Sequence, residues 1–245
     1  MSLLATGIDI AERAPLPDAA LKFGVSALVE NARRRIVRQD DPQEIEFARD
    51  MAAHPIAEHA EAANAQHYEL PEAFFGLVLG PRRKYSSCLY TPTATTLPEA
   101  EEVALAETCM HAGLQDGQAI LELGCGWGSL SLWMAETMPN ATISSVSNSA
   151  SQRDYIERQA RARSLTNLTV ITADMNDFAT DTRFDRVVSV EMFEHMSNWQ
   201  ALLSRVRGWL KPEGKLFIHI FTHRSTPYRF DHNDDADWIL SLIHI

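Results

Sequence analysis

The heptapeptide 190–196, VEMFEHM, places two carboxylates and an imidazole within five residues, directly after an apolar run. On a helix, Glu191, Glu194 and His195 stand at positions i, i+3 and i+4 and share one face. Carboxylates attract a cationic group, and histidine, with a reference pKa near ~6.5, accepts a proton close to neutral pH. The pattern therefore fits proton handling at an active site. The alternative is an ordinary helix start, because acidic residues also favour the first turn of a helix.

A second candidate is the glycine-rich segment 119–128, AILELGCGWG, which reads as a strand, a turn and the start of a helix. Gly124 and Gly126 permit a sharp turn and close approach of a ligand to the backbone. The G-x-G-x-G spacing differs from the G-x-G-x-x-G of a pyrophosphate-binding turn, which leaves a dinucleotide and S-adenosylmethionine as competing ligands. The next strand ends without the acid that usually binds a dinucleotide ribose. The polar groups there are Ser147, Asn148 and Gln152.

The third predicted strand ends in a polar group of its own, at 174–176. Asp174 is suited to hold a polar edge of a ligand, and Asn176 follows it closely. Met175 can pack against an adenine face, although filling the core is an equally good explanation of a methionine there.

The elements that must position these residues are strands alternating with helices from 119 onwards. Five strands are recognisable, which predicts an α/β protein with a doubly wound, mostly parallel sheet. Ligands of such sheets bind at the carboxyl ends of the strands. The glycine turn follows the first strand and VEMFEHM follows the fourth, so both are expected at the same edge. Upstream, residues 18–66 read as a helical extension, and further helices are expected from Pro71 to Gly80 and up to Gly113.

Composition narrows the possible functions. The chain has 245 residues and a formal net charge of −11, which disfavours nucleic-acid binding. Its three scattered cysteines indicate neither a disulfide framework nor a structural zinc site, and no metal ligand set is predicted. No apolar run has the ~20 residues of a membrane span, and the first residues do not resemble a signal peptide. A cytoplasmic location is the default expectation.

Several segments, in order, carry a family resemblance: HYELPEAFFGLVLG, KYSSCLY, ILELGCGWGSLSL, SNSASQ, FDRVVSVEMFEHM and KPEGKLFIHIF. Between about His67 and Trp238 the chain resembles the superfamily of cyclopropane-fatty-acyl-phospholipid synthases and coclaurine-type N-methyltransferases. The resemblance implies a Rossmann-like class I methyltransferase that uses S-adenosyl-L-methionine.

The resemblance also implies roles for the residues already singled out. Cofactor contacts would come from Tyr85 and Ser86 at the methionine end, Gly124 and Gly126 along the turn, Ser147, Asn148 and Gln152 near the ribose, and Asp174, Met175 and Asn176 around the adenine. No contact is assigned to the neighbouring basic run at 82–84.

Two branches of the superfamily differ in the residues that follow the fourth strand. Cyclopropane synthases have Cys where this chain has Ser87 and Gly where it has Glu191, while Glu194 and His219 match them. The coclaurine-type enzymes read Glu-Met-Phe-Glu-His, as here. This branch makes Glu191, Glu194 and His195 the catalytic candidates, with Tyr68 as a wall for the substrate. His219 is a second substrate candidate, for which a core histidine on a strand is an equally good explanation. Which of the three takes a proton stays open.

The leading hypothesis is methyl transfer to the nitrogen of a small amine. The alternatives are cyclopropane synthesis on unsaturated lipid chains, which would involve peripheral membrane contact, and cofactor binding without turnover. A nucleic-acid methyltransferase is disfavoured because no Asn/Asp-Pro-Pro-Tyr/Phe run follows the fourth strand. We expect a helical extension at 1–66, a methyltransferase domain at 67–240 lacking its last two strands, and a non-native tail at 241–245. The oligomeric state is not predicted.

Overall fold

The computed structural model describes residues 16–38, 44–58 and 71–222. The chain divides into two compact units, Met51–Phe221 and a smaller unit made of Met1–Asp50 with Thr222–Ile245. The smaller unit contains helices α2 (Asp18–Arg38) and α3 (Glu44–Asp50). The helical prediction for the N-terminal region is thus confirmed over these two spans, whereas residues 59–66 lie outside the described residues.

The helical segment predicted for residues 18–66 extends further along the chain than the helices in the structure. After α3 a short 3-10 helix, η1 (Met51–Ala53), is followed by irregular chain at 54–58. Pro55 has no N–H to donate to a preceding turn, which ends the helix there. Ile56 and Ala57 are buried instead, and Ala57 forms an isolated antiparallel bridge with Met196.

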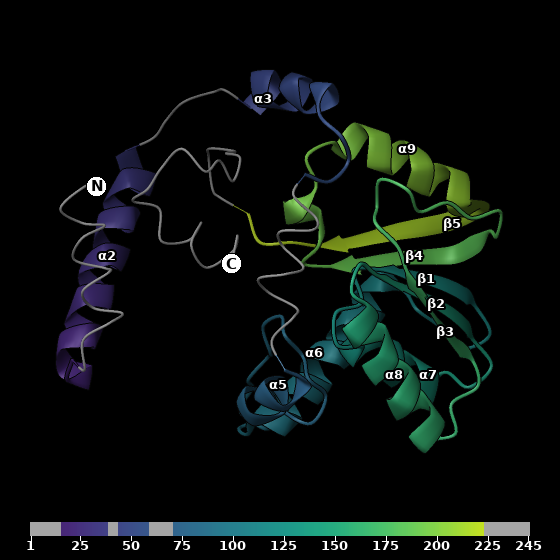
Figure 1. Ribbon diagram of the computed structural model, residues 1–245, viewed down its shortest axis with the longest axis horizontal. Coiled ribbons are helices and arrows are strands. Elements are labelled where there is room, and N and C mark those ends of the chain that lie inside the picture. Colours follow the sequence, from purple (N-terminus) through teal and green to yellow (C-terminus); the bar gives the residue numbers. More distant parts are fainter. Residues whose placement is uncertain (1–15, 39–43, 59–70, 223–245) are drawn as a thin grey trace. The chain divides into compact units, whose positions relative to one another are not determined.

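The large unit is built on a five-stranded sheet in the order β3-β2-β1-β4-β5, and every pair in it is parallel. The strands are β1 (Ala119–Leu123), β2 (Thr142–Ser147), β3 (Leu168–Thr172), β4 (Phe184–Val190) and β5 (Leu210–His219). Apolar residues dominate β1 and β4, as expected for central strands buried on both faces. The predicted α/β fold is confirmed, and Figure 1 shows β1 and β4 in the middle of the sheet.

Strand β5 begins earlier than the sequence indicates. The predicted strand starts at Lys215, but pairing with β4 already begins at Leu210, with a break in register between Phe184 and Arg186. A Cβ on Gly214 would lie 2.8 Å from the carbonyl oxygen of Phe184. The missing side chain therefore lets the two backbones approach at this irregularity.

Helices cover both faces of the sheet, so the doubly wound arrangement is confirmed. Helix α9 (Trp199–Trp209) packs on one face, and α7 (Ser129–Thr137) and α8 (Ala150–Ala162) lie on the other (Figure 1). Helix α6 (Leu97–Ala112) joins the α7 side through a shared apolar cluster. Its ends follow from sequence: a capping box between Thr96 and Glu99 starts it, and left-handed Gly113 ends it.

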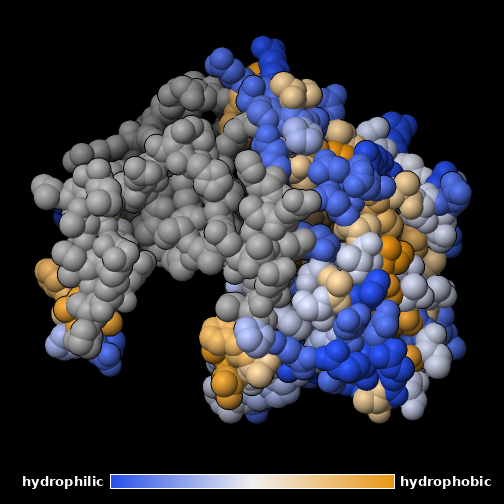
Figure 2. All heavy atoms as spheres, viewed as in Figure 1, coloured by the Kyte–Doolittle hydropathy of each residue, from blue (hydrophilic) through white to orange (hydrophobic). Residues whose placement is uncertain are grey.

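The short helix α5 (Glu72–Val78) precedes α6 and exposes apolar side chains. Phe74, Leu77 and Val78 are exposed, whereas Phe75 is buried against Trp127. Figure 2 shows hydrophobic residues gathered at α5, beside a hydrophilic face over α8. Within the described ranges, no helix is both long and apolar enough to traverse a lipid bilayer.

Candidate active site

The glycine turn lies directly against the segment that carries the carboxylates. Gly124 has φ +79°, and a Cβ built on it would be 2.7 Å from both Cβ and Cγ of Met192. Strands β1 and β4 pair in this region, and the Ser189 hydroxyl donates to the carbonyl oxygen of Leu123 over 3.0 Å. The prediction that both motifs share one edge of the sheet is therefore confirmed.

The second glycine of the turn faces open space. Gly126 has φ +51°, and no atom lies within 4 Å of a Cβ built on it. Two buried polar atoms nearby, Nε1 of Trp127 and Nε2 of Gln152, have no hydrogen-bond partner among the described residues. The carbonyl oxygen of the Gln152 side chain accepts from the Ser147 hydroxyl at 2.7 Å, which fixes the amide and leaves its N–H groups free to donate. We call the surroundings of Gly126, Trp127 and Gln152 the cradle. A buried donor without a partner is costly, so the cradle suits a ligand rich in acceptor atoms, as adenosyl cofactors are.

At the end of β3 the structure gives the three predicted adenine contacts different surroundings. Asn176 donates from Nδ2 to the carbonyl oxygen of Ala57 and accepts the Ala57 N–H on Oδ1, which anchors the irregular segment at 54–58. Met175 is 8% exposed and belongs to the apolar cluster beneath α9. Asp174 is half-buried, and its Oδ1 accepts the Asn176 N–H at 2.6 Å. Asn148 lies half-buried at the end of β2.

The carboxylate segment is not the regular helix that the spacing predicts. Glu191 has φ +52°, and only Phe193–His195 form a short 3-10 helix, η3. A left-handed residue cannot continue a right-handed helix, and the Glu191 N–H donates instead to the carbonyl oxygen of His219 at 2.7 Å. The three polar residues are therefore brought together by a turn pinned to β5, and the expected i, i+3, i+4 face is wrong.

Glu194 is half-buried within this segment. Burial raises its pKa, and the nearby Glu191 carboxylate raises it further, while backbone hydrogen bonds oppose both. Its Oε1 accepts the Phe221 N–H at 2.9 Å, and its Oε2 is buried with no partner within the described ranges. An uncompensated carboxylate oxygen of this kind is a ready acceptor for a cationic N–H group. His195 is exposed on η3, and His219 is half-buried at the end of β5.

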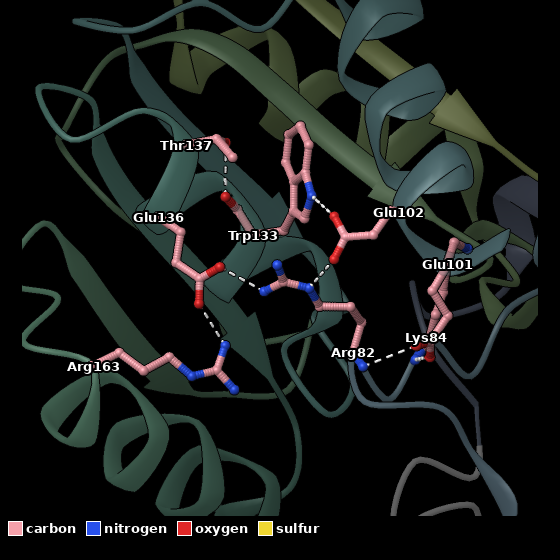
Figure 3. Close-up of polar contacts among 8 residues, drawn as sticks. All are labelled: Arg82, Lys84, Glu101, Glu102, Trp133, Glu136, Thr137 and Arg163. Atoms are coloured by element: carbon pink, nitrogen blue, oxygen red, sulfur yellow. Dashed lines mark hydrogen bonds and ion pairs between the residues drawn. The ribbon is translucent and has the colours of Figure 1, made fainter. Parts of the chain in front are cut away.

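The loop between α5 and α6 is held in place by the helices around it. The buried carboxylate of Glu101 accepts the backbone N–H groups of Arg82 and Lys84 at 2.9 and 3.0 Å. Figure 3 shows the Arg82 guanidinium reaching Glu102 and Glu136, which come from α6 and α7. These charge-assisted contacts fix the backbone that leads into Tyr85 and Ser86.

Within this loop, Tyr85 is 58% exposed and the Ser86 hydroxyl accepts a hydrogen bond from the Lys84 ammonium. Tyr68, the predicted wall of the substrate pocket, lies outside the described residues. Among the residues that the structure covers, no three His, Cys, Asp or Glu side chains gather as metal ligands would.

Three charged residues near the site escaped sequence reasoning. Lys84 is 6% exposed and Glu101 is fully buried, although both occur in stretches that read as solvated. Glu122 lies beneath the glycine turn, where the Ser131 and Ser145 hydroxyls donate to its carboxylate. Burial raises the pKa of Glu122 to about 7. A usable signal existed only for Glu122, because an acid inside the apolar strand AILEL must find partners.

Comparison with known proteins gives this geometry a context. The sequence profile of the family described as Mycolic acid cyclopropane synthetase matches residues 56–244. (S)-coclaurine N-methyltransferase of Thalictrum flavum subsp. glaucum is 36% identical over 188 residues, which are 77% of this chain and 52% of that protein. Cyclopropane-fatty-acyl-phospholipid synthase of Escherichia coli (strain K12) is 33% identical over 168 residues, 68% of this chain and 42% of that protein. The chain thus spans about half the length of the curated relatives that it matches.

A solved structure agrees with the fold. The crystal structure of coclaurine N-methyltransferase bound to N-methylheliamine and SAH superposes with a TM-score of 0.83 at 32% identity, covering 97% of this chain and 68% of that one. The mycolic acid cyclopropane synthase CmaA1, complexed with SAH and CTAB, gives a TM-score of 0.60 at 26% identity, covering 66% of this chain and 57% of that chain. Because the family profile matches most of the chain, the chain belongs to the mycolic acid cyclopropane synthetase family.

Proposed function

We propose that this chain is the cofactor-binding part of an S-adenosylmethionine-dependent methyltransferase that methylates the nitrogen of a small amine. The observation that carries the proposal is the contact between Gly124 and Met192. In this contact the glycine turn lies against Met192, the residue that follows Glu191 in the carboxylate segment. A cofactor bound along the turn would therefore have carboxylates, the natural partners of an amine, next to its reactive end.

The cradle fits the cofactor chemically. Gly126 leaves room for close approach of a ligand to the backbone, and the amide of Gln152 offers buried donors to hydroxyl or carboxylate oxygens. When bound, the cofactor supplies an activated methyl group on a sulfonium, so the protein needs to provide alignment and an unprotonated nucleophile. Solved relatives support the assignment, since two of them were crystallised with SAH.

The carboxylates account for recognition of an amine and removal of its proton. An amine is mostly protonated near neutral pH, and the unpartnered Oε2 of Glu194 can accept a hydrogen bond from the resulting ammonium. Because burial raises the pKa of Glu194, this carboxylate is a stronger base than an exposed one. The imidazole of His195 is the second group that can take the proton. Similarity to the N-methyltransferases supports the amine as acceptor.

The test compares acceptors and variants in parallel. The protein is incubated with methyl-labelled cofactor and either a panel of secondary amines or vesicles of unsaturated phospholipid. We expect label in the amines. Glu194→Gln and His195→Ala should each retain affinity for S-adenosylhomocysteine by calorimetry, and the one that loses transfer identifies the base. The matched control is Glu213→Gln, an exposed glutamate on β5.

The alternatives give different outcomes. Label in the lipid chains with none in the amines would favour the cyclopropane synthase reaction, for which the exposed apolar surface of α5 next to the cofactor loop is a suitable approach. Binding of S-adenosylhomocysteine without any labelled product would leave cofactor binding as the function of this chain. Absence of binding would contradict the proposal altogether.

A further inference from the structure

Residues 54–58 form a segment for which the proposed reaction has so far no use, and we call it the strap. The strap is irregular chain, yet Ile56 is 4% and Ala57 9% exposed. Ile56 belongs to the apolar cluster that also contains Met175 and Phe193. Buried backbone outside helices and sheets needs hydrogen-bond partners from other parts of the chain. These partners show which elements the strap holds together.

The first anchor of the strap is the end of β3. The side-chain amide of Asn176 accepts the Ala57 N–H at 3.2 Å and donates to the Ala57 carbonyl oxygen at 2.9 Å. Asn176 is itself fixed, because its N–H donates to Asp174 at 2.6 Å and its carbonyl oxygen accepts from Arg205 of α9 at 2.7 Å. One amide thus satisfies both backbone groups of Ala57, as a neighbouring strand would.

The second anchor lies directly after the short helix η3. The Ser197 N–H donates to the carbonyl oxygen of Ile56 at 2.8 Å, and the Ser197 hydroxyl donates to Oε2 of Glu58 at 2.7 Å. Nδ2 of the buried Asn198 donates to the carbonyl oxygen of His54 at 2.8 Å. Oε1 of Glu58 lies 2.9 Å from Nδ1 of His54, which braces the strap from within.

The carboxylate segment is therefore held at both of its ends. At its start the Glu191 N–H donates to His219 of β5, and at its end residues 196–198 are bound to the strap. Between these points η3 spans only three residues, and so short a 3-10 helix contributes little hydrogen bonding of its own. The two attachments consequently decide where the side chains of Glu194 and His195 lie.

We propose that Asn176 is a positioning residue that, through the strap, fixes the end of the carboxylate segment and sets where Glu194 and His195 meet the acceptor. That the acceptor is an amine rests on the proposed function. The role differs from the adenine contact that the family resemblance implies, because the amide of Asn176 already serves Ala57 with both its donor and its acceptor atom. The end of β3 and the carboxylate segment are thereby connected through a part of the chain that precedes both.

The first experiment requires neither cofactor nor turnover. Asn176→Ala and Glu58→Ala each release one anchor of the strap, so their effects on the unfolding equilibrium constant in urea should be non-additive by at least about threefold. The matched control is Asn167→Ala, because the amide of Asn167 donates to the carbonyl oxygens of Ala135 and Met138 at the other end of β3. Its effect should add to that of Glu58→Ala. Strict additivity of Asn176→Ala with Glu58→Ala would overturn the coupling.

The second experiment separates positioning from stability. In Asn176→Ala and Glu58→Ala the KM for the amine should rise at least about threefold, while affinity for S-adenosylhomocysteine stays within about twofold in calorimetry. Glu58→Gln keeps an oxygen that can accept from the Ser197 hydroxyl, so it should restore the KM. Asn167→Ala should lower stability and leave the KM unchanged.

The opposite results are equally specific. An affinity for S-adenosylhomocysteine reduced at least about tenfold in Asn176→Ala, with an unchanged KM for the amine, would overturn the inference and make Asn176 a cofactor contact. If Asn176→Ala does not fold, an unchanged KM in Glu58→Ala overturns the inference as well, because that variant leaves β3 and the carboxylate segment unaltered. Failure of the unaltered protein to methylate amines would contradict the proposed function, and the stability cycle would still decide whether the strap couples its two anchors.

Discussion

The two glycines of the turn have different tasks, and this decides which substitution tests cofactor binding. A side chain at Gly124 would collide with Met192, so a bulky residue there disturbs the packing between β1 and β4 as well as any ligand. At Gly126 the space is open and only the left-handed backbone is demanding. Asparagine tolerates that conformation better than other residues with a side chain.

Gly126→Asn should therefore leave the fold intact and fill the cradle. We expect affinity for S-adenosylhomocysteine to fall by at least about tenfold in calorimetry, since the amide would occupy the position of the ligand. Gly117→Asn is the matched control, because Gly117 also has positive φ and open space but precedes β1 at its other end. Equal affinities for the two variants would contradict the placement of the ligand at the turn.

Glu122 makes stability depend on pH. Its pKa in the folded protein is about 7, above the ordinary value of 4.5 for a glutamate, so the folded state binds a proton that the unfolded state releases between these values. Stability from this group is therefore highest at low pH and is lost as pH rises through about 7. Between pH 6 and 8.5 the loss is of order 1 kcal/mol.

Glu122→Gln should remove that part of the pH dependence, because an amide can still accept from Ser131 and Ser145 but cannot ionise. The measurement is urea unfolding of both proteins at pH 6 and 8.5, in which all other titrating groups cancel. Identical slopes of stability against pH in the two proteins would show that Glu122 titrates normally.

At the level of elements, α6 supports the loop between α5 and α6, which leads into Tyr85 and Ser86. Glu101 satisfies two backbone N–H groups of that loop, and Gly80 makes room for it, since a Cβ there would lie 2.3 Å from the carboxylate. Replacing a charged acceptor by an amide leaves one buried N–H facing another, which costs about 1.5–3 kcal/mol.

Glu101→Gln should accordingly lower the free energy of unfolding by that amount and weaken cofactor binding through displacement of the loop. Glu107→Gln changes a partly exposed position of the same helix, where the carboxylate has a 3.6 Å contact with His111, and should cost less than about 0.5 kcal/mol. Chemical denaturation gives the free energy of unfolding of both variants. Equal losses in the two would show a general effect of charge on α6 and not a specific role of Glu101 in holding the loop.

The elements also show where sequence reasoning succeeds. Both ends of α6 were predictable, because Thr96, Glu99 and Gly113 encode its caps locally. The turn at Glu191 was not, since its sequence suits a helix and the competing hydrogen bond comes from His219 on another strand. The burial of Lys84 was equally hidden, because the carboxylate of Glu101 that binds its backbone comes from a helix that follows later in the chain. Local signals thus gave the strands and the shared edge, and non-local partners decided the details of the site.

For the whole molecule, charge determines which partners are excluded. The net charge is −11, and arginines of the two basic runs at 33–35 and 82–84 form ion pairs with acidic neighbours. Arg33 and Arg34 bind Glu30, while Arg82 binds Glu102 and Glu136. These ion pairs reduce the positive charge that the two runs offer to a polyanion.

We expect no retention of duplex DNA or RNA in gel-shift assays at 150 mM salt, even at micromolar protein. Reducing the salt tests the same point more stringently, because any phosphate contact would strengthen there. Binding that strengthens steeply at low salt would reveal a basic surface that the ion pairs do not neutralise.

The strand order has a consequence for how such proteins can diverge. The glycine turn follows β1 and the carboxylate segment follows β4, and the two halves of the sheet meet where β1 pairs with β4. At that seam a side chain on Gly124 would collide with Met192, so a larger residue at 124 would require a smaller one at 192. Position 191 lies just beyond the seam, where its left-handed backbone and the hydrogen bond from its N–H to His219 restrict the residues that fit there. A change of side chain at position 191 that keeps this backbone would thus alter the charge beside the turn and leave the pairing of β1 with β4 intact.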